Sequence, residues 1–231
     1  MYQINATMEN WVRELDTEGR MIDRIVHAYD DPIIRLYCRG RFQILRLPFL
    51  QEIGQYLPRE GMILDIGCGF GLFSLFYAMR SPRAKLRGID QNSRRIATAI
   101  RVAQRLGLSN TSYEVGDATT CKLEGCFDGA YMLDVIHHIP VAAVMPLLRR
   151  VKQVLRPGSR LIIKDVDTRP FFKLWFTFAL DKIMDYRTPV HYWESAYLRS
   201  SLEGLGLEVH LHAMRDYLPY PHVLYICRLP S

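Results

Sequence analysis

The segment that most constrains the fold is residues 63–71, whose sequence is ILDIGCGFG. A short apolar run ends on Asp65, and three alternating glycines follow before a predicted helix that begins at Leu72. This order predicts a buried strand, a tight loop and a helix N-terminus. Glycine permits positive φ and leaves space for a ligand against bare backbone, and the start of a helix offers unpaired N–H groups. The segment therefore predicts a site for a nucleoside-containing ligand, either SAM (S-adenosylmethionine) or NAD, since dinucleotide-binding folds use the related pattern GxGxxG.

Two further predicted strands also lead into an acid. The strand 86–90 ends at Asp90, where a carboxylate can accept both hydroxyls of a ribose. The strand 111–115 runs into Asp117. Each acid has an alternative role as a helix cap or a turn former.

The next two predicted strands continue the alternation with helices. The strand 127–134 passes into His137 and His138, and residues 155–165 predict a helix stop, a turn at 157–158 and a fifth strand. Strands that alternate with helices favour parallel pairing and a three-layer sandwich. Ligands of such open sheets bind outside the carboxyl ends of the strands, which is where both histidines should lie.

These five strand signals, in this order, resemble the class I SAM-dependent methyltransferases, closely over residues 61–165 and more loosely beyond. The D-x-G-x-G-x-G motif of that family falls on Asp65, Gly67, Gly69 and Gly71. A dinucleotide dehydrogenase would not be expected to carry the signals at 116–118 and 157–158 as well. The resemblance implies SAM as the cofactor, bound by Asp65, Gly67, Cys68, Gly69, Asp90, Gln91, Asp117, Ala118 and Leu133.

The resemblance also implies which part of SAM each group meets. The backbone of 66–69 is expected to approach the methionine part, whose amino group the carbonyl of Leu133 should bind. Asp90 is expected to bind the ribose hydroxyls, with Gln91 beside it against the adenine. Asp117 is expected to accept a hydrogen bond from the exocyclic amine of the adenine.

The implied fold is α/β, a three-layer αβα sandwich with a seven-stranded, mostly parallel sheet that ends in an antiparallel hairpin, plus N-terminal helices. Residues 207–213 and 222–227 are strand-like and match that hairpin. We expect one domain, 1–231, made of an N-terminal helical cap (1–60), a cofactor-binding core (61–165), a substrate-covering insertion (166–194), and the last helix with the terminal hairpin (195–231).

Apolar periodicity predicts helices on both sides of the glycine loop. Residues 41–57 carry an apolar stripe at three- and four-residue spacing, and Pro48 should kink or divide that helix. The helix 93–106 should turn Ile100 inward, with Asn92 as its N-cap.

Charge and cysteine content narrow the class of protein. The net charge of +6 and the pI of about 9.1 would suit nucleic acid or another anionic partner, but the basic residues are dispersed, as on solvated faces. The five cysteines include no CxxC pair and no cluster with zinc spacing, which indicates a reducing compartment and no metal site. The sequence displays neither a signal-peptide pattern nor an apolar run of about 20 residues, so the expected location is the cytoplasm.

The histidine pair after the fourth strand is the best candidate for acid–base chemistry. Histidine titrates near neutral pH, so it can take a proton from a phenol, a hydroxyl or a protonated amine. His138 is the first candidate for a general base and His137 the second. The alternative is that His138 only forms a wall of the site, as a similar histidine does in many small-molecule methyltransferases. Two roles are open for Asp134, which are binding a substrate amine and capping the following turn.

Two segments are expected to decide the acceptor molecule. In the family, N-terminal helices often close over SAM, and this chain offers Tyr29, Tyr37, Arg39 and Arg41 there. Residues 170–184 predict a helix that is apolar over most of its circumference and has to be buried. It can be buried in the fold or a dimer, cover an aromatic or lipid-like acceptor, or dock at a membrane surface, although it lacks a basic face for the last role. Residues 186–194 should line the pocket mouth, with His191 and Tyr192 as second-rank catalytic candidates.

The sequence thus predicts a SAM-dependent methyltransferase that acts on O, N or C of a small, hydrophobic, aromatic or lipid-like molecule. The segment 134–137 stands where many adenine- and glutamine-modifying methyltransferases carry an N-P-P-Y-type signature, which argues against such targets. The alternatives are an RNA or protein methyltransferase and a non-catalytic partner protein with a SAM fold. The chain is also a candidate to form a homodimer.

Overall fold

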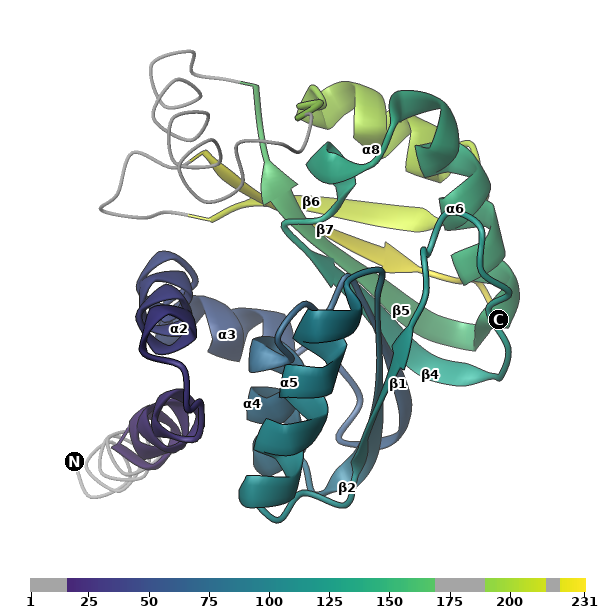
Figure 1. The fold of residues 1–231 in the computed structure, drawn as a ribbon. Coiled ribbons are helices and arrows are strands. Elements are labelled where there is room, and N and C mark those ends of the chain that lie inside the picture. Colours follow the sequence, from purple (N-terminus) through teal and green to yellow (C-terminus); the bar gives the residue numbers. More distant parts are fainter. Residues whose placement is uncertain (1–15, 169–189, 215–220) are drawn as a thin grey trace, which may run out of the picture.

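A computed structural model describes residues 16–168, 190–214 and 221–231. Its centre is a seven-stranded sheet with the strand order β3-β2-β1-β4-β5-β7-β6 (Figure 1). The strands are β1 (Glu60–Ile66), β2 (Arg83–Asp90), β3 (Thr111–Val115), β4 (Phe127–Leu133), β5 (Leu155–Val166), β6 (Glu208–Ala213) and β7 (His222–Arg228). The pairs among β1 to β5 are parallel, and β7 joins β5 and β6 in antiparallel fashion. The predicted sheet and its terminal hairpin are confirmed.

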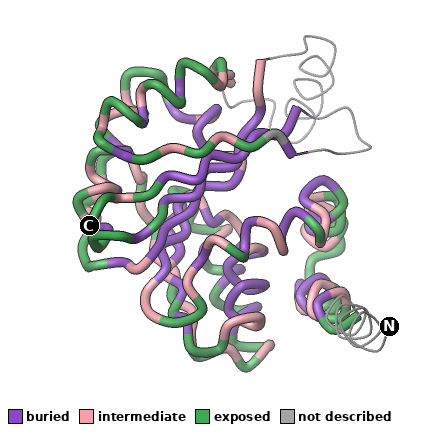
Figure 2. The backbone as a smooth tube through the Cα atoms, turned by 180° about the vertical axis from the view of Figure 1, so that it is seen from behind, coloured by how far each residue is buried: buried purple, intermediate pink, exposed green. Residues whose placement is uncertain are grey.

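Helices cover both faces of this sheet. The helical elements are a helix through 16–27, α2 (Pro32–Ile44), α3 (Leu47–Gly54), α4 (Leu72–Arg80), α5 (Ser93–Arg105), the 3-10 turn η1 (Ile136–His138), α6 (Val141–Val154) and α8 (Ser195–Glu203). One apolar core packs the helices from the N-terminus to α5 against one face, and a second core packs α6 and α8 against the other. Figure 2 shows the buried strands between helices whose outer surfaces are exposed. The three-layer sandwich is therefore confirmed.

The strand β1 shows why the apolar run before the glycines is continuous. Ile63 packs into one core, whereas Leu64 and Ile66 pack into the other. A parallel strand covered on both faces needs apolar residues at successive positions. Since β1 lies between β2 and β4, the strand order reverses at β1, and this reversal opens a crevice at the carboxyl ends of the strands.

One helix prediction is confirmed at its break, and another needs correction. The segment 41–57 is divided as the position of Pro48 predicts, because α2 ends at Ile44 and α3 begins at Leu47 with Pro48 in its first turn. Proline has no N–H to donate to the preceding turn, so the earlier helix cannot continue through it. On α5, Asn92 caps the helix as predicted, but Ile100 is 38 % exposed because the buried face is centred on neighbouring positions.

The strand β5 includes the residues predicted as a helix stop and a turn. It starts at Leu155 and contains the turn at 157–158, where Gly158 has a φ of +76°. The register between β4 and β5 shifts at this point, between Phe127 and Gly129. The predicted helix 170–184 lies outside the described residues, as does the first half of 186–194, so the role of the segment 166–194 as a substrate cover stays a prediction. Within the described ranges, no helix is long and apolar enough to cross a membrane.

Candidate functional site

A cavity of about 710 Å³ opens at the carboxyl ends of β1, β2 and β4. This volume lies within the range of about 300–1,000 Å³ that is usual for small-molecule sites. The structure places every predicted cofactor residue on its wall: Asp65, Gly67, Cys68, Gly69, Asp90, Gln91, Asp117, Ala118 and Leu133. The same wall carries the catalytic candidates His137 and His138. What these residues bind stays a prediction.

The glycine loop between β1 and α4 has a left-handed backbone at three positions. Gly67, Gly69 and Gly71 have φ values of +75°, +54° and +81°. A Cβ atom on Gly67 would lie 2.6 Å from Cγ2 of Val135, whereas a Cβ atom on Gly69 would meet nothing within 4 Å. The N–H of Gly67 donates to the carbonyl of Ile89 at 2.8 Å, which holds the loop against β2. The loop is therefore fixed on one side and open to the cavity at Gly69.

Asp90, at the end of β2, organises the adjoining part of the wall. Its Oδ2 accepts a 2.9 Å hydrogen bond from the N–H of Gly69, and its Oδ1 accepts one of 2.8 Å from the N–H of Asn92. A carboxylate has about four acceptor sites, so these two bonds leave acceptor capacity for a ligand. Gln91 beside it is exposed at the rim of the cavity.

Asp117 forms a turn at the cavity wall, and its contact with the adenine stays a prediction. Its Oδ1 accepts hydrogen bonds from the N–H and the hydroxyl of Thr119, at 2.8 and 2.7 Å, as a turn former does. It is exposed and also lines the cavity, next to Ala118. A turn-forming carboxylate in this position still has its second oxygen for a ligand.

Buried polar groups support the glycine loop from behind. Asp65 is 4 % exposed, and its carboxylate accepts a 2.9 Å hydrogen bond from the hydroxyl of Tyr131, its partner on β4. Burial raises the pKa of Asp65 to about 7, although hydrogen bonds from Tyr131 and Ser74 oppose the shift. Burial also raises the pKa of the Cys68 thiol, so this side chain behaves as a small, neutral group.

The N-terminal helices meet the glycine loop through aromatic side chains. The hydroxyl of the buried Tyr29 donates to the carbonyl of Phe70 at 2.8 Å, and the ring of Tyr37 meets the Phe70 ring edge-on at 5.5 Å. Tyr37 and Arg41, one turn apart on α2, both line the cavity. Arg39 lies on the exposed side of α2 and lines no part of it. Of the four N-terminal residues that the sequence offered, Tyr37 and Arg41 line the cavity, Tyr29 supports the glycine loop, and Arg39 lies outside.

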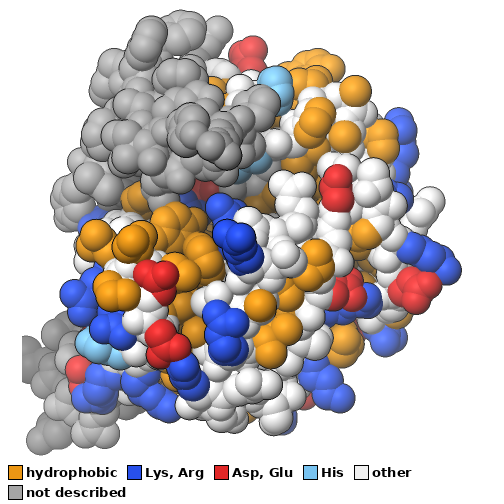
Figure 3. All heavy atoms as spheres, viewed as in Figure 1, with side chains coloured by type: hydrophobic (Ala, Val, Ile, Leu, Met, Phe, Trp, Pro, Cys, Tyr) orange, Lys and Arg blue, Asp and Glu red, His pale blue; other side chains and the backbone are white. Residues whose placement is uncertain are grey.

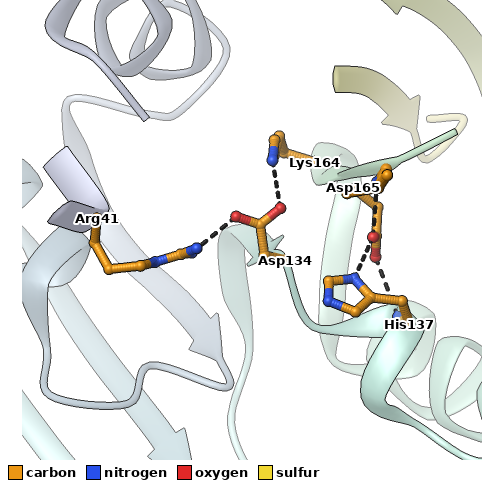
Figure 4. Close-up of polar contacts among 6 residues, drawn as sticks. Arg41, Asp134, His137, Lys164 and Asp165 are labelled. Carbon is orange, nitrogen blue, oxygen red and sulfur yellow. Dashed lines mark hydrogen bonds and ion pairs between the residues drawn. The ribbon is translucent and has the colours of Figure 1, made fainter. Parts of the chain in front are cut away.

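Asp134, directly after β4, lies between two cations (Figure 4). Its Oδ2 pairs with Arg41 Nη2 at 2.8 Å, and its Oδ1 pairs with the ammonium of Lys164, a fully buried residue of β5. Burial of the Asp134 carboxyl opposes its ionisation, but Lys164 and Arg41 outweigh that effect and hold its pKa well below the usual range. Asp134 also has a left-handed backbone, with a φ of +57°. The structure thus shows Asp134 as an ion-paired carboxylate on the cavity wall, and amine binding by this residue stays a prediction.

The two histidines have different surroundings. His137 is 2 % exposed, and its Nδ1 lies 2.5 Å from Oδ1 of Asp165 on β5. The backbone N–H of His191 donates to the carbonyl of His137 at 2.7 Å, and the Tyr192 ring stacks on the His137 ring at 5.8 Å. The second-rank candidates therefore lie around His137. Burial, with a contribution from His137, lowers the pKa of His138 to about 4.

Sequence reasoning missed Lys164 and Asp165 as site residues. Both belong to β5, which it treated only as a structural strand, and both are at most 4 % exposed. Two adjacent charged residues at the end of the apolar run 161–163 were the available signal, because charged side chains are almost never fully buried unless they are paired.

The cavity presents groups that suit each part of SAM. The open space at Gly69 would admit a ligand against the loop backbone, and Leu133 lines the wall where β4 ends. Asp90 retains acceptor capacity that suits a ribose diol, and Asp117, which lines the cavity, has a second carboxylate oxygen that suits an adenine amine. The residues present therefore fit the cofactor.

Comparisons with known proteins agree with this geometry. A family model described as a methyltransferase domain matches residues 63–158. An O-methyltransferase, cnsE, of Penicillium expansum is 31 % identical over 120 residues, which cover 50 % of this chain and 42 % of that protein. A ubiquinone biosynthesis O-methyltransferase of Cereibacter sphaeroides is 31 % identical over 133 residues, which cover 55 % of this chain and 51 % of that protein. The chain thus spans about half the length of the curated relatives it matches.

A solved structure extends the likeness in fold to nearly the whole chain. The magnesium protoporphyrin IX methyltransferase ChlM from Synechocystis PCC 6803, with bound S-adenosylhomocysteine (SAH), aligns with a TM-score of 0.63 and 20 % identity. The alignment covers 89 % of this chain and 93 % of that one. The D-x-G-x-G-x-G loop, the strand order and the methyltransferase-domain match over residues 63–158 make this chain similar to the class I SAM-dependent methyltransferases, whose fold it shares.

Proposed function

We propose that this chain is an enzyme that transfers the methyl group of SAM to O, N or C of a small, hydrophobic, aromatic or lipid-like molecule. One observation supports this proposal: the open glycine loop, Asp90 and His137 line the same cavity, and His137 pairs with the buried Asp165. The glycine loop and Asp90 suit the methyl donor. The His137–Asp165 pair suits removal of a proton from the acceptor molecule.

The residues contribute mainly by binding and orientation. When bound, SAM supplies an electrophilic methyl group on its sulfonium. The backbone at Gly69 and the carboxylate of Asp90 would hold the cofactor, and the helix α2 would cover its methionine end with Tyr37. Holding the two reacting atoms close and aligned can supply much of the rate enhancement of such a displacement.

For proton removal we propose His137 as the general base and Asp165 as the group that orients it. Asp165 accepts at Nδ1 of His137, so the imidazole would take the acceptor's proton on Nε2, the nitrogen turned away from Asp165 (Figure 4). The carboxylate would then stabilise the imidazolium that forms. His138, the first candidate from the sequence, is less suited, because a base with a pKa of about 4 accepts protons poorly at neutral pH.

The proposed acceptor class draws support from relatives and from surface charge. The relatives of this chain include a ubiquinone biosynthesis O-methyltransferase and a sterol 24-C-methyltransferase. Basic side chains on the face in Figure 3 are scattered among acidic ones and gather in no stripe that would track a nucleic acid. Five cysteines that form no disulfide favour the cytoplasm as the location.

Calorimetry with SAM and SAH tests the cofactor half of the proposal. We expect saturable binding of both, and the absence of such binding would refute the enzyme proposal. Tight NAD binding with none for SAM would favour a dehydrogenase instead. Incubation with SAM labelled on its methyl group, offered in parallel with phenols, sterols, amines, RNA and protein, then tests the acceptor class. Transfer to RNA or protein alone would contradict the proposed small-molecule acceptor.

A further inference from the structure

We propose that Asp134 is a positioning residue for methyl transfer, which fixes Arg41, and with it helix α2, against the donor end of the cavity. This inference rests on the proposed function and adds a link between the N-terminal helices and the sheet edge. Neither residue needs to touch the reacting atoms for this role. The inference is argued from the ion-paired cluster of Arg41, Asp134 and Lys164 (Figure 4).

The first observation is that the cluster joins elements from distant parts of the chain across the cavity wall. Arg41 comes from α2, Asp134 follows β4, and Lys164 comes from β5. Arg41 and Asp134 both line the cavity, and their side chains are 15 % and 8 % exposed. The pair is thus largely shielded from water, so it is screened much less than a surface ion pair would be.

The second observation is that Asp134 is held from the sheet side independently of Arg41. Its backbone N–H donates to the carbonyl of Lys164 at 2.9 Å, and the ammonium of the same lysine pairs with its carboxylate. A non-glycine residue with a φ of +57° is held in a costly conformation, and such conformations persist where the surroundings determine them. Asp134 is therefore a fixed anchor to which Arg41 attaches.

The third observation is that α2 depends on its inner face for attachment. Its outer face exposes Ile33 and Leu36, at 79 % and 72 %. Its inner face presents Tyr37 to the glycine loop and Arg41 to Asp134, one turn apart. The guanidinium of Arg41 also lies 5.8 Å from the centroid of the Phe73 ring. Because α2 also buries apolar side chains in the core, loss of the Arg41–Asp134 pair should loosen, without detaching, the part of α2 that covers the donor.

The test uses Arg41→Gln in the full chain, because this change leaves the pair of Asp134 and Lys164 intact. The matched control is Arg39→Gln, which removes the same charge from the exposed side of α2. The measured quantities are the SAH dissociation constant by calorimetry and hydrogen exchange of the α2 backbone with SAH bound. Arg41→Gln should weaken SAH binding by at least about tenfold, since removing one partner of a buried charge pair speeds release of what it holds. Arg39→Gln should leave both quantities within about twofold of wild type.

Two further variants separate positioning from general stability. Arg41→Lys keeps the charge and should restore part of the affinity, with the unfolding midpoint unchanged. The double variant of Arg41→Gln with Asp134→Asn should bind SAH no more weakly than Asp134→Asn alone, because both changes break one contact. Wild-type SAH affinity in Arg41→Gln, equal exchange in α2, or additive effects in the double variant would overturn the inference. Failure of the wild-type chain to bind SAH would instead refute the proposed function.

Discussion

Alanine at position 67 should damage the chain far more than alanine at position 69, although both glycines have left-handed backbones. Gly67 has a φ of +75° and Gly69 a φ of +54°. A Cβ on Gly67 would lie 2.6 and 2.9 Å from the two methyl groups of Val135, distances at which something must move. A Cβ on Gly69 would meet no protein atom within 4 Å. The two variants therefore share the backbone strain and differ in the clash.

The structure sets the size of each effect. A left-handed conformation costs a non-glycine residue about 1–2 kcal/mol, and overpacking of a tight site adds about 1–3 kcal/mol. Gly67→Ala should therefore lower the free energy of unfolding by about 2–5 kcal/mol, against about 1–2 kcal/mol for Gly69→Ala. In a chain of this size, each kcal/mol lowers the unfolding midpoint by about 2–4 °C.

Urea unfolding followed by circular dichroism measures both variants, and a third substitution tests the clash itself. Val135→Ala removes both offending methyl groups and leaves Val135 Cβ at 3.4 Å, an ordinary contact distance. Combined with Gly67→Ala, it should recover the overpacking energy but not the backbone strain. The reasoning is wrong if Gly67→Ala is no less stable than Gly69→Ala, or if the effects of Gly67→Ala and Val135→Ala simply add. Gly69→Ala should instead show its main loss in SAM affinity, because its methyl group would fill the open side of the loop.

Other predictions concern titration and the proposed roles. Burial raises the pKa of Asp65 to about 7, so the folded chain keeps a proton that the unfolded chain releases. The free energy of unfolding should therefore fall as pH rises from about 4 to about 7. Asp65→Asn should flatten this pH dependence in urea unfolding experiments. Because burial lowers the pKa of His138 to about 4, stability should also fall as pH drops from about 6.5 to about 4, and an unchanged loss in His138→Gln would contradict this. Asp165→Asn should lower kcat by about 100-fold or more with little change in the KM for SAM, as expected for a group that orients a general base. Asp90→Ala should weaken SAH binding in calorimetry by roughly 10- to 100-fold, through loss of charge-assisted hydrogen bonds.

Local chemistry explains why part of this site could be predicted from the sequence. The positive φ of the glycine loop and the strand-end position of Asp90 follow from residues that are neighbours in the chain. The strand 111–115 is found with the predicted bounds, and Asn92 caps α5 with its own side chain. Such features depend little on the rest of the fold, so periodicity and turn chemistry are enough to find them.

The remaining features depend on contacts between distant segments. Arg41 and Asp134 are 93 positions apart, and nothing near either residue indicates their pairing. For the same reason, the sequence could not indicate that Asp165 contacts Nδ1 of His137 or that burial lowers the pKa of His138 to about 4, because both are properties of the folded chain.

The surroundings of Asp134, His137 and His138 determine which of these residues can accept a proton near neutral pH, and a pH–rate profile can detect the difference. Lys164 and Arg41 hold Asp134 ionised, so Asp134 cannot exchange a proton near neutral pH. Burial leaves His138 too weak a base to accept one efficiently. In the proposed mechanism, proton acceptance therefore falls to His137, whose Nδ1 contacts Asp165. Substitution of Asp165 should consequently shift the pH dependence of kcat, whereas substitution of Arg41 should weaken cofactor binding and leave that pH dependence in place. A profile that moved with Arg41 would mean that positioning and proton transfer are coupled through Asp134.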